Sequence, residues 1–223
     1  MKSLSADVVV IGGGSTGAGV VRDVAMRGYR AVLVDRADLA QGTTGRYHGL
    51  LHSGGRYVVS DPQSARECAE ENAILTRIQA DAIEETGGYF VATPQDDPAW
   101  GDTWLAGARA TGVAAEEVAI PDVLAAEPRL NPGIRRAFHV ADGAVDGWQL
   151  VWGAARSAQE YGAQILTYHR VTGIERDGDR VAAVVCHDAK TRTDVRIECG
   201  FVINCAAAWG GSRTSCSARC SSV

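Results

Sequence analysis

Three glycines near the start of the chain have the spacing G-x-G-x-x-G, and their surroundings make that spacing informative. Gly12, Gly14 and Gly17 follow a β-branched apolar run at 6–12 and stand where a helical pattern begins. The first glycine permits a tight turn, the second lets the backbone approach a pyrophosphate, and the third lets helix and strand pack closely. The N–H groups and the positive dipole end of the helix favour phosphate oxygens. The spacing therefore predicts a dinucleotide-binding loop.

Asp35 is the second part of this predicted site. It ends another apolar run, at 30–35, and its distance from Gly17 is close to the ~20-residue spacing of dinucleotide-binding folds. A carboxylate there can accept hydrogen bonds from both hydroxyls of an adenosine ribose, and it repels a 2′-phosphate, so NADP is disfavoured. The loop and the acid do not discriminate between FAD and NAD.

The segment GTTGRYHGLLHSGGRY, at 42–57, carries reactive side chains in an unusual setting. It contains five glycines, two histidines, two arginines and two tyrosines, with no helical or strand periodicity. The two leucines in its middle are untypical of a flexible linker. We therefore interpret it as an ordered loop.

The hydrophobic pattern predicts the scaffold that positions these residues. A strand at 6–12, a glycine turn, a helix at 15–29 and a strand at 30–35 indicate parallel pairing and an α/β fold class. Val21 and Ala25 mark the apolar face of the helix, and Gly28 is typical of a helix C-terminus.

The remaining chain alternates helices and strands before it becomes mainly β. Periodicity predicts a long helix at 60–88, a strand at 88–94, a helix at 96–113, a short helix at 120–132 that Pro128 stops, a strand and turn at 133–147, and a helix at 148–162. Four strands follow at 163–211, with an Asp177-Gly178 turn. Residues 212–223 are small, polar and patternless, so we expect an unfolded tail.

The composition excludes several classes of protein. The net charge of −5 over 223 residues argues against nucleic-acid binding, which needs a basic face. No apolar run approaches the ~20 residues of a membrane span, and the N-terminus lacks the features of a signal peptide. Six cysteines form no CxxC pair and the histidines lack ligand spacing, so we expect no metal site. We expect a cytoplasmic protein.

Several segments together resemble the FAD-dependent glycerol-3-phosphate dehydrogenases, within the D-amino-acid-oxidase-like flavoproteins. IGGGSTGAGVVRDVAMRG resembles the family fingerprint, while TTGRYHGLLHSGGRY and SARECAEEN look most like the flavin subunit of the anaerobic enzyme. DGAVDGWQL resembles a further family segment, and VINCAAAWGG resembles a flavin-contacting strand end, with Ala207 where the family usually has glycine. The resemblance covers about 6–211, well under half of a full family member, so the chain looks truncated.

The resemblance implies a Rossmann-like FAD-binding domain of the D-amino-acid-oxidase/glutathione-reductase type, with part of a mixed-sheet substrate domain. We assign 1–90 to the first part of the FAD-binding domain, 91–150 to the partial substrate domain, and 151–211 to the returning part of the FAD-binding domain. The tail at 212–223 matches nothing in the family and resembles the product of a frameshift.

The resemblance also implies FAD as the cofactor, with Thr hydroxyls and an Arg fork against its pyrophosphate. The alternative for Thr43 and Thr44 is helix capping. Together with the glycine loop, this gives a set of predicted FAD-binding residues: Gly12, Gly13, Gly14, Ser15, Thr16, Gly17, Asp35, Arg36, Thr43, Thr44, Arg46, His48, Gly49, Leu50, Val171, Ala206 and Ala207.

The implied reaction is oxidation of sn-glycerol 3-phosphate to dihydroxyacetone phosphate, by hydride transfer to N5 of the flavin. Arg56 and Tyr57 fall on an Arg-Tyr pair near the family's substrate pocket, although a surface ion pair is the alternative for Arg56. His48 and His52 are candidates for the base that takes the hydroxyl proton, or for groups that orient the loop. The family passes its electrons to quinone through partner subunits, which also provide its peripheral association with the inner face of the cell membrane.

Three other interpretations stay open at this stage. The chain could be a flavoenzyme of the same superfamily that acts on an amine or another hydroxy acid, although Arg56-Tyr57 and SARECAEEN argue against it. It could be a catalytically inactive fragment that only holds FAD, with exposed sheet edges. It could be an NAD-binding domain, but the glycine-rich loop and long helix replace the parallel strand expected there.

Overall fold

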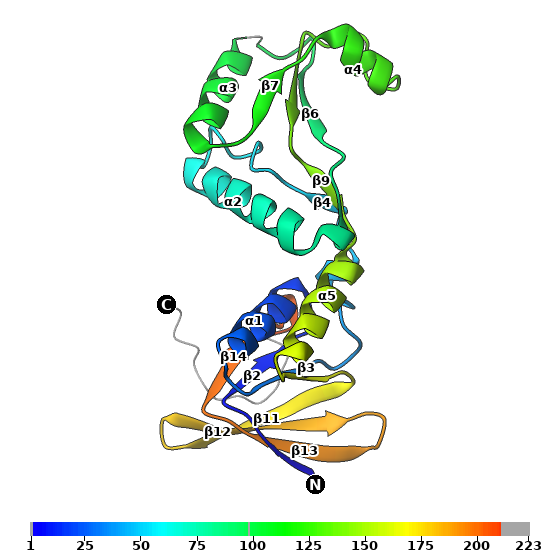
Figure 1. Ribbon diagram of the computed structural model, residues 1–223. Helices are drawn as coiled ribbons and strands as arrows, with labels where there is room; N and C mark the ends of the chain where they lie inside the picture. The colour runs from blue at the N-terminus through cyan, green and yellow to red at the C-terminus, as the bar shows by residue number, and fades with distance from the viewer. Residues whose placement is uncertain (1, 98, 211–223) are drawn as a thin grey trace. The chain divides into compact units, whose positions relative to one another are not determined.

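The computed structural model describes residues 2–97 and 99–210 (Figure 1). The chain divides into two compact units. The first unit is built from residues up to Tyr47 and from Gly147 onward, and the second unit consists of His48–Asp146. Two stretches far apart in the sequence therefore make one unit, and a continuous stretch makes the other.

A parallel sheet forms the centre of the first unit. Its strands are hydrogen-bonded in the order β10-β3-β2-β14, and they are β2 (Val8–Ile11), β3 (Ala31–Val34), β10 (Gln164–Leu166) and β14 (Phe201–Asn204). Both β2 and β3 are almost entirely buried, as expected for strands covered on both faces. The parallel βαβ unit predicted from the sequence is confirmed.

Alternating residues of these strands pack against two different layers. Val10 and Leu33 pack with the apolar faces of helices α1 (Ser15–Met26) and α5 (Gly147–Glu160). Val9 and Val32 point to the opposite face and pack with a second sheet. The period of two along a strand thus gives helices on one side of the sheet and strands on the other.

The second sheet has the order β1-β13-β12-β11, and its strands are β1 (Lys2–Ser5), β11 (His169–Asp177), β12 (Arg180–Asp188) and β13 (Thr193–Glu198). Gly178 has a φ of +58° in the β11–β12 connection, consistent with the predicted turn. Strand β1 pairs parallel with β13. Strand β1 has no hydrophobic signal in the sequence, because it is short and only Leu4 in it is half-buried.

The second unit consists of helices and two small sheets. Its helices are α2 (Pro62–Ile78), α3 (Trp100–Thr111) and α4 (Ile120–Ala126). One sheet has the order β6-β8-β7, and its strands are β6 (Gly88–Ala92), β8 (Arg136–Val140) and β7 (Ala115–Glu117). The other sheet has the order β4-β9-β5, and its strands are β4 (Leu50–Leu51), β9 (Gly143–Val145) and β5 (Ile83–Glu84). Trp104 anchors the core, because its ring packs with Phe90 and Phe138 and its Nε1 donates to the Gly55 carbonyl oxygen at 2.9 Å.

The predicted helix at 60–88 is too long. Helix α2 ends at Ile78, and the chain continues as a 3₁₀ turn at Ala80–Ala82 and the strand β5. The cause is tertiary, since β5 pairs with β9, whose residues lie far along the chain. The hydrogen bonds between β5 and β9 therefore outweigh the local helical pattern of the residues after Ile78.

The predicted division into FAD-binding and substrate domains stays a prediction, because the two units are defined by their packing and not by a ligand. Residues 48–90, which the prediction assigns to the FAD-binding domain, pack in the second unit, and the chain returns to the first unit at Gly147. The reason is again β9, which pairs with both Leu50–Leu51 and Ile83–Glu84 and so holds these segments in the second unit. The tail at 212–223 lies outside the described residues.

Candidate functional site

The backbone around Gly12, after β2, and Gly17, in the first turn of α1, is packed too closely for a side chain at either position. Gly12 has a φ of +109°, and a Cβ there would lie 2.6 Å from the Cys205 carbonyl oxygen. A Cβ at Gly17 would lie 1.8 Å from the Gly12 carbonyl oxygen. The first and third glycines therefore have the roles predicted for them, a tight turn and a close contact of helix with loop.

The N-terminus of α1 opens towards a threonine that the sequence also singles out. Gly14 is the N-cap and, as a glycine, has no side chain to cap the helix; Thr44 takes that role, as the capping alternative for Thr44 predicts. Thr44 Oγ1 accepts the Ser15 N–H at 3.1 Å and lies 3.3 Å from Ser15 Oγ. Thr44 comes from the short 3₁₀ helix at Thr43–Gly45, so the structure brings this loop to the first turn of α1. Backbone amides and hydroxyls at a helix N-terminus form a suitable pyrophosphate cradle.

Asp35 binds the glycine loop directly. Its Oδ2 accepts the Gly13 N–H at 2.7 Å and its Oδ1 accepts the Ala37 N–H at 2.8 Å. The carboxylate therefore fixes the loop to the end of β3, a contact that the spacing of residues does not predict. An ionised carboxylate has about four acceptor positions, so these two bonds leave capacity for ribose hydroxyls.

The end of β14 forms the opposite wall of the glycine loop. The Cys205 N–H donates to the Ile11 carbonyl oxygen at 2.8 Å, and the Ala206 N–H donates to Asn204 Oδ1 at 3.0 Å. Ala207, where the family usually has glycine, has a φ of +48°. Ala207 is therefore an alanine in a backbone conformation that glycine adopts without strain.

Other predicted FAD-binding residues make contacts of their own. The Arg36 guanidinium stacks 4.3 Å above the Trp209 ring. Arg46 donates to carbonyl oxygens of its own loop, at Gln41 and, at 3.2 Å, Gly42. Val171 lies in β11 and packs in the core between the two sheets. The cofactor roles of Arg36, Arg46 and Val171 stay predictions, as do those of Thr16, Thr43, Gly49 and Leu50.

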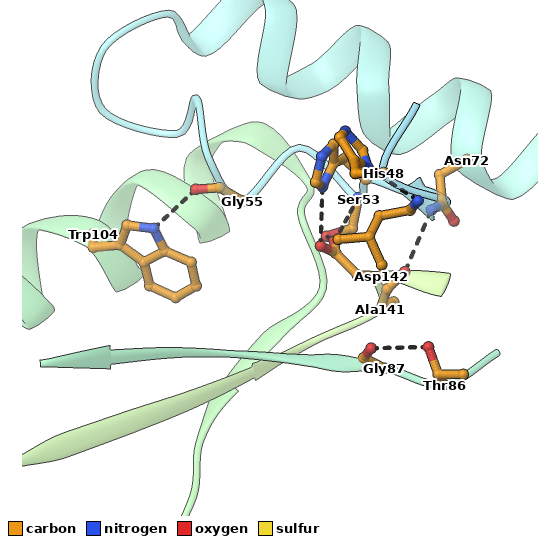
Figure 2. A network of polar contacts seen from close by, with 11 residues as sticks. His48, Ser53, Gly55, Asn72, Thr86, Gly87, Trp104, Ala141 and Asp142 are labelled. Atoms are coloured by element: carbon orange, nitrogen blue, oxygen red, sulfur yellow. Dashed lines mark hydrogen bonds and ion pairs between the residues drawn. The ribbon is translucent and has the colours of Figure 1, made fainter. Parts of the chain in front are cut away.

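A second polar cluster lies in the second unit and centres on Asp142 (Figure 2). Its Oδ1 accepts the Ser53 N–H at 2.7 Å and the Ser53 hydroxyl at 2.6 Å. Its Oδ2 lies 3.2 Å from His52 Nδ1. Burial raises the pKa of the Asp142 carboxyl, but the hydrogen bonds from Ser53 and His52 outweigh burial, and the pKa falls below its ordinary value.

His48 and His52 are neighbours in this cluster, with ring centroids 5.1 Å apart. His48 is exposed, and its Nδ1 accepts the Leu50 N–H at 3.1 Å. His52 is half-buried against Asp142. The two histidines therefore have different ring environments, although the sequence offers no basis for separating them.

Arg56 and Tyr57 lie beyond this cluster, in the turn that precedes α2. Both side chains are exposed, and the Tyr57 N–H donates to the Gly54 carbonyl oxygen at 2.9 Å. Within the described part of the chain, the Arg56 guanidinium forms no ion pair with a carboxylate. The surface ion pair considered for Arg56 is therefore not seen, and its side chain is accessible to an anion.

Ser53 and Asp142 are the members of the site that sequence reasoning missed. In the sequence, Asp142 stands out only as the start of a family-like segment. It lies between two β segments, and its partners are 89 and 90 residues away in sequence. A polar residue between two short strands is the only signal there, and that signal does not identify the partners.

Two properties of the described residues bear on other functions. Among residues 2–97 and 99–210, no group of three or more His, Cys, Asp or Glu side chains is arranged to hold a metal ion. Of the helices in this described part of the chain, none has the length and apolar character needed to cross a membrane.

Comparisons with known proteins show the family of the chain. The family model described as FAD dependent oxidoreductase matches residues 7–218. The chain is 44% identical over 208 residues to a subunit of the anaerobic glycerol-3-phosphate dehydrogenase of Escherichia coli K12, covering 93% of this chain and 38% of that protein. It is 46% identical over 216 residues to a subunit of the anaerobic glycerol-3-phosphate dehydrogenase of Haloferax volcanii, covering 93% and 37%. The chain thus spans less than half the length of these relatives.

Solved structures show the same fold at lower identity. L-proline dehydrogenase from P. horikoshii superposes with a TM-score of 0.79 at 20% identity, covering 94% of this chain and 54% of that one. Glycerol-3-phosphate dehydrogenase from Bacillus halodurans, complexed with FAD, has a TM-score of 0.66 at 24% identity, covering 92% and 35%. The predicted fold class is confirmed by these neighbours.

Proposed function

The chain belongs to the FAD-dependent oxidoreductase family, and we propose that it forms part of an enzyme that oxidises sn-glycerol 3-phosphate to dihydroxyacetone phosphate. The observation that carries this proposal is the 44% identity over 208 residues to a subunit of an anaerobic glycerol-3-phosphate dehydrogenase. Since the chain covers 38% of that relative, the substrate and partners of the whole protein are inferred.

The residues of the first unit fit FAD. Ser15 and Thr16 are exposed in the first turn of α1, so a pyrophosphate would reach the N-terminus of this helix and the hydroxyls of Ser15 and Thr44 beside it. Asp35 would accept the ribose hydroxyls while it holds the loop in place. FAD supplies the hydride acceptor of the reaction, and the protein supplies binding and orientation.

The residues of the second unit supply what the substrate needs. Arg56 is exposed and not engaged with a carboxylate among the described residues, so its guanidinium would bind the substrate phosphate, for which a planar fork of donors is well suited. His52 would accept the proton of the C2 hydroxyl, while the hydride on C2 goes to the flavin. The resemblance supports the role of Arg56, whereas the choice of His52 over His48 as the base is part of this proposal.

The proposal extends to electron transfer and location. Electrons would pass to a quinone through partner subunits, and the protein would be cytoplasmic, with a peripheral position on the inner face of the cell membrane. Fractionation of cells tests the location: the protein should move from the soluble to the membrane fraction when partner subunits are co-expressed. A constant soluble fraction would contradict the peripheral position.

Flavin reduction without oxygen tests the substrate. The FAD-loaded protein is mixed anaerobically with sn-glycerol 3-phosphate, D-erythritol 1-phosphate, proline or glycine, and the visible flavin band is followed. We expect bleaching by sn-glycerol 3-phosphate. Bleaching by an amine and not by a polyol phosphate would refute the proposal. FAD binding without bleaching by any donor would favour the alternative of an inactive FAD-binding chain.

A pair of arginine variants tests the phosphate contact. Arg56→Gln should raise the substrate concentration needed for half-maximal reduction about 10- to 100-fold, because a charge-assisted hydrogen bond contributes about 1.5–3 kcal/mol. Arg66→Gln is the matched control, since Arg66 is exposed on α2 near the same turn. Equal effects of the two variants would show that only general electrostatics is involved.

A further inference from the structure

The carboxylate of Asp142 is held at both of its oxygens in different ways. Oδ1 accepts two hydrogen bonds from Ser53, one from its N–H and one from its hydroxyl. Oδ2 lies 3.2 Å from His52 Nδ1. Ser53 is buried, and its backbone donor cannot rotate, so the orientation of the carboxylate is fixed by the Ser53 side.

This arrangement determines where a neutral His52 ring carries its proton. An ionised carboxylate only accepts hydrogen bonds, so the His52 nitrogen that faces it must be the donor. The proton therefore lies on Nδ1, and Nε2 keeps the lone pair. His48 has the opposite arrangement, because its Nδ1 accepts the Leu50 N–H, which places the proton of a neutral His48 ring on Nε2.

We infer that Asp142 is a positioning residue that holds His52 with its proton on Nδ1, so that Nε2 of His52, and not His48, accepts the proton of the substrate hydroxyl. The inference rests on the proposed function and deepens it. Oxidation of the secondary alcohol breaks the C2–H bond, whose electron pair leaves as hydride to the flavin, and the O–H bond, whose proton goes to His52 Nε2. A carbon–oxygen double bond forms at C2, and the charges balance.

The isosteric variant Asp142→Asn gives a directional test. The Ser53 N–H and hydroxyl both donate to Oδ1, so the amide oxygen of the asparagine must occupy that position. Its NH₂ group then replaces Oδ2 and donates to His52 Nδ1. His52 must therefore switch its proton to Nε2, where it can no longer accept one. In serine proteases, replacement by asparagine of the aspartate beside the catalytic histidine likewise gives the wrong histidine tautomer and a large loss of activity.

The tautomer can be read directly, without turnover. Nitrogen NMR of the full chain, at a pH where imidazole is neutral, separates pyrrole-type from pyridine-type ring nitrogens, and His52→Gln identifies the His52 signals among the five histidines. We expect Nδ1 of His52 to be pyrrole-type in the wild-type protein and pyridine-type in Asp142→Asn. A wild-type His52 protonated on Nε2 would overturn the inference, and this outcome does not depend on the folding of Asp142→Asn.

A matched control is available on the exposed β12–β13 hairpin. His187 Nδ1 lies 2.9 Å from Asp194 Oδ1, the same chemical pair outside the site. Asp142→Asn should slow flavin reduction by sn-glycerol 3-phosphate at least about 100-fold, the range of general-base catalysis, whereas Asp194→Asn should leave the rate unchanged. An unchanged rate in Asp142→Asn with a switched tautomer would overturn the catalytic part of the inference.

The two failures are distinguishable. If sn-glycerol 3-phosphate does not reduce the flavin of the wild-type protein, the proposed function fails, and the tautomer measurement still stands. If reduction proceeds but His52 carries its proton on Nε2, the proposed function stands, and the role of Asp142 fails.

Discussion

Ala207 is an alanine in a left-handed backbone conformation, and its replacement by glycine should stabilise the protein. A φ of +48° costs an L-residue about 1–2 kcal/mol, because its Cβ approaches the carbonyl oxygen. Glycine removes that strain but adds conformational freedom to the unfolded chain, which costs about 0.5–1 kcal/mol. Ala207 is exposed, so little buried apolar surface is lost. The net gain expected for Ala207→Gly is therefore about 0.5–1 kcal/mol.

Urea unfolding measures this gain, and a neighbour provides the control. Ala208 lies in the same 3₁₀ turn, at Ala207–Trp209, without a positive φ. Ala208→Gly has no strain to release, so it should destabilise the protein by about 0.5–1 kcal/mol. Thermal unfolding should shift in the same directions, by about 1–4 °C for a chain of this size. Destabilisation of similar size by both variants would refute the left-handed assignment of Ala207.

Three further predictions concern the site. Gly17→Ala should abolish FAD binding in a flavin titration, since its Cβ would lie 1.8 Å from the Gly12 carbonyl oxygen. Asp35→Ala should reduce the free energy of unfolding by about 1–3 kcal/mol in urea and weaken FAD binding, because the Gly13 N–H loses its acceptor. The folded-state pKa of Asp142 is lowered, so the carboxylate stabilises the folded protein at pH values above the unfolded pKa of about 3.9. This stabilisation should be lost as the pH falls through the folded-state pKa. Urea unfolding at a series of acidic pH values measures the loss.

Each of these predictions has its own control. Gly19→Ala should preserve FAD binding, because a Cβ at Gly19 meets open space. Asp35→Asn keeps one oxygen acceptor and should lose less stability than Asp35→Ala. In Asp142→Asn the part of the acid dependence that belongs to this carboxyl should disappear. An acid profile identical to that of the wild-type protein would contradict the assignment to Asp142.

The sequence predicted the parts of the fold that local chemistry determines. The glycine loop, the βαβ unit and the acid at the end of β3 follow from residue types at fixed spacing, and all three are seen in the structure. FAD as the cofactor and the family are likewise confirmed by the matching family model. The glycine loop, the βαβ unit and the acid have in common that a stretch of fewer than about 40 residues contains their complete signal, whereas FAD and the family followed from a resemblance over most of the chain.

The sequence could not predict features that depend on distant partners. The end of α2 at Ile78 is set by the pairing of β5 with β9, and no local residue stops the helical pattern there. The role of Asp142 depends on Ser53 and His52, which are 89 and 90 residues away. Long-range pairing thus decided both the wrong helix end and the missed member of the site.

The construction of the first unit from two distant stretches has a consequence for the order of folding. Strand β2 receives β14 as a neighbour, with Val8 paired to Phe201, so this pairing closes a very long loop. The second unit is continuous in sequence and leaves a ribosome before β14 does. Because long-range contacts form slowly and domains fold as units during synthesis, we expect the inserted unit to fold first. Pulsed hydrogen exchange during refolding should protect α2 and β6 before β14, and the reverse order would contradict this expectation.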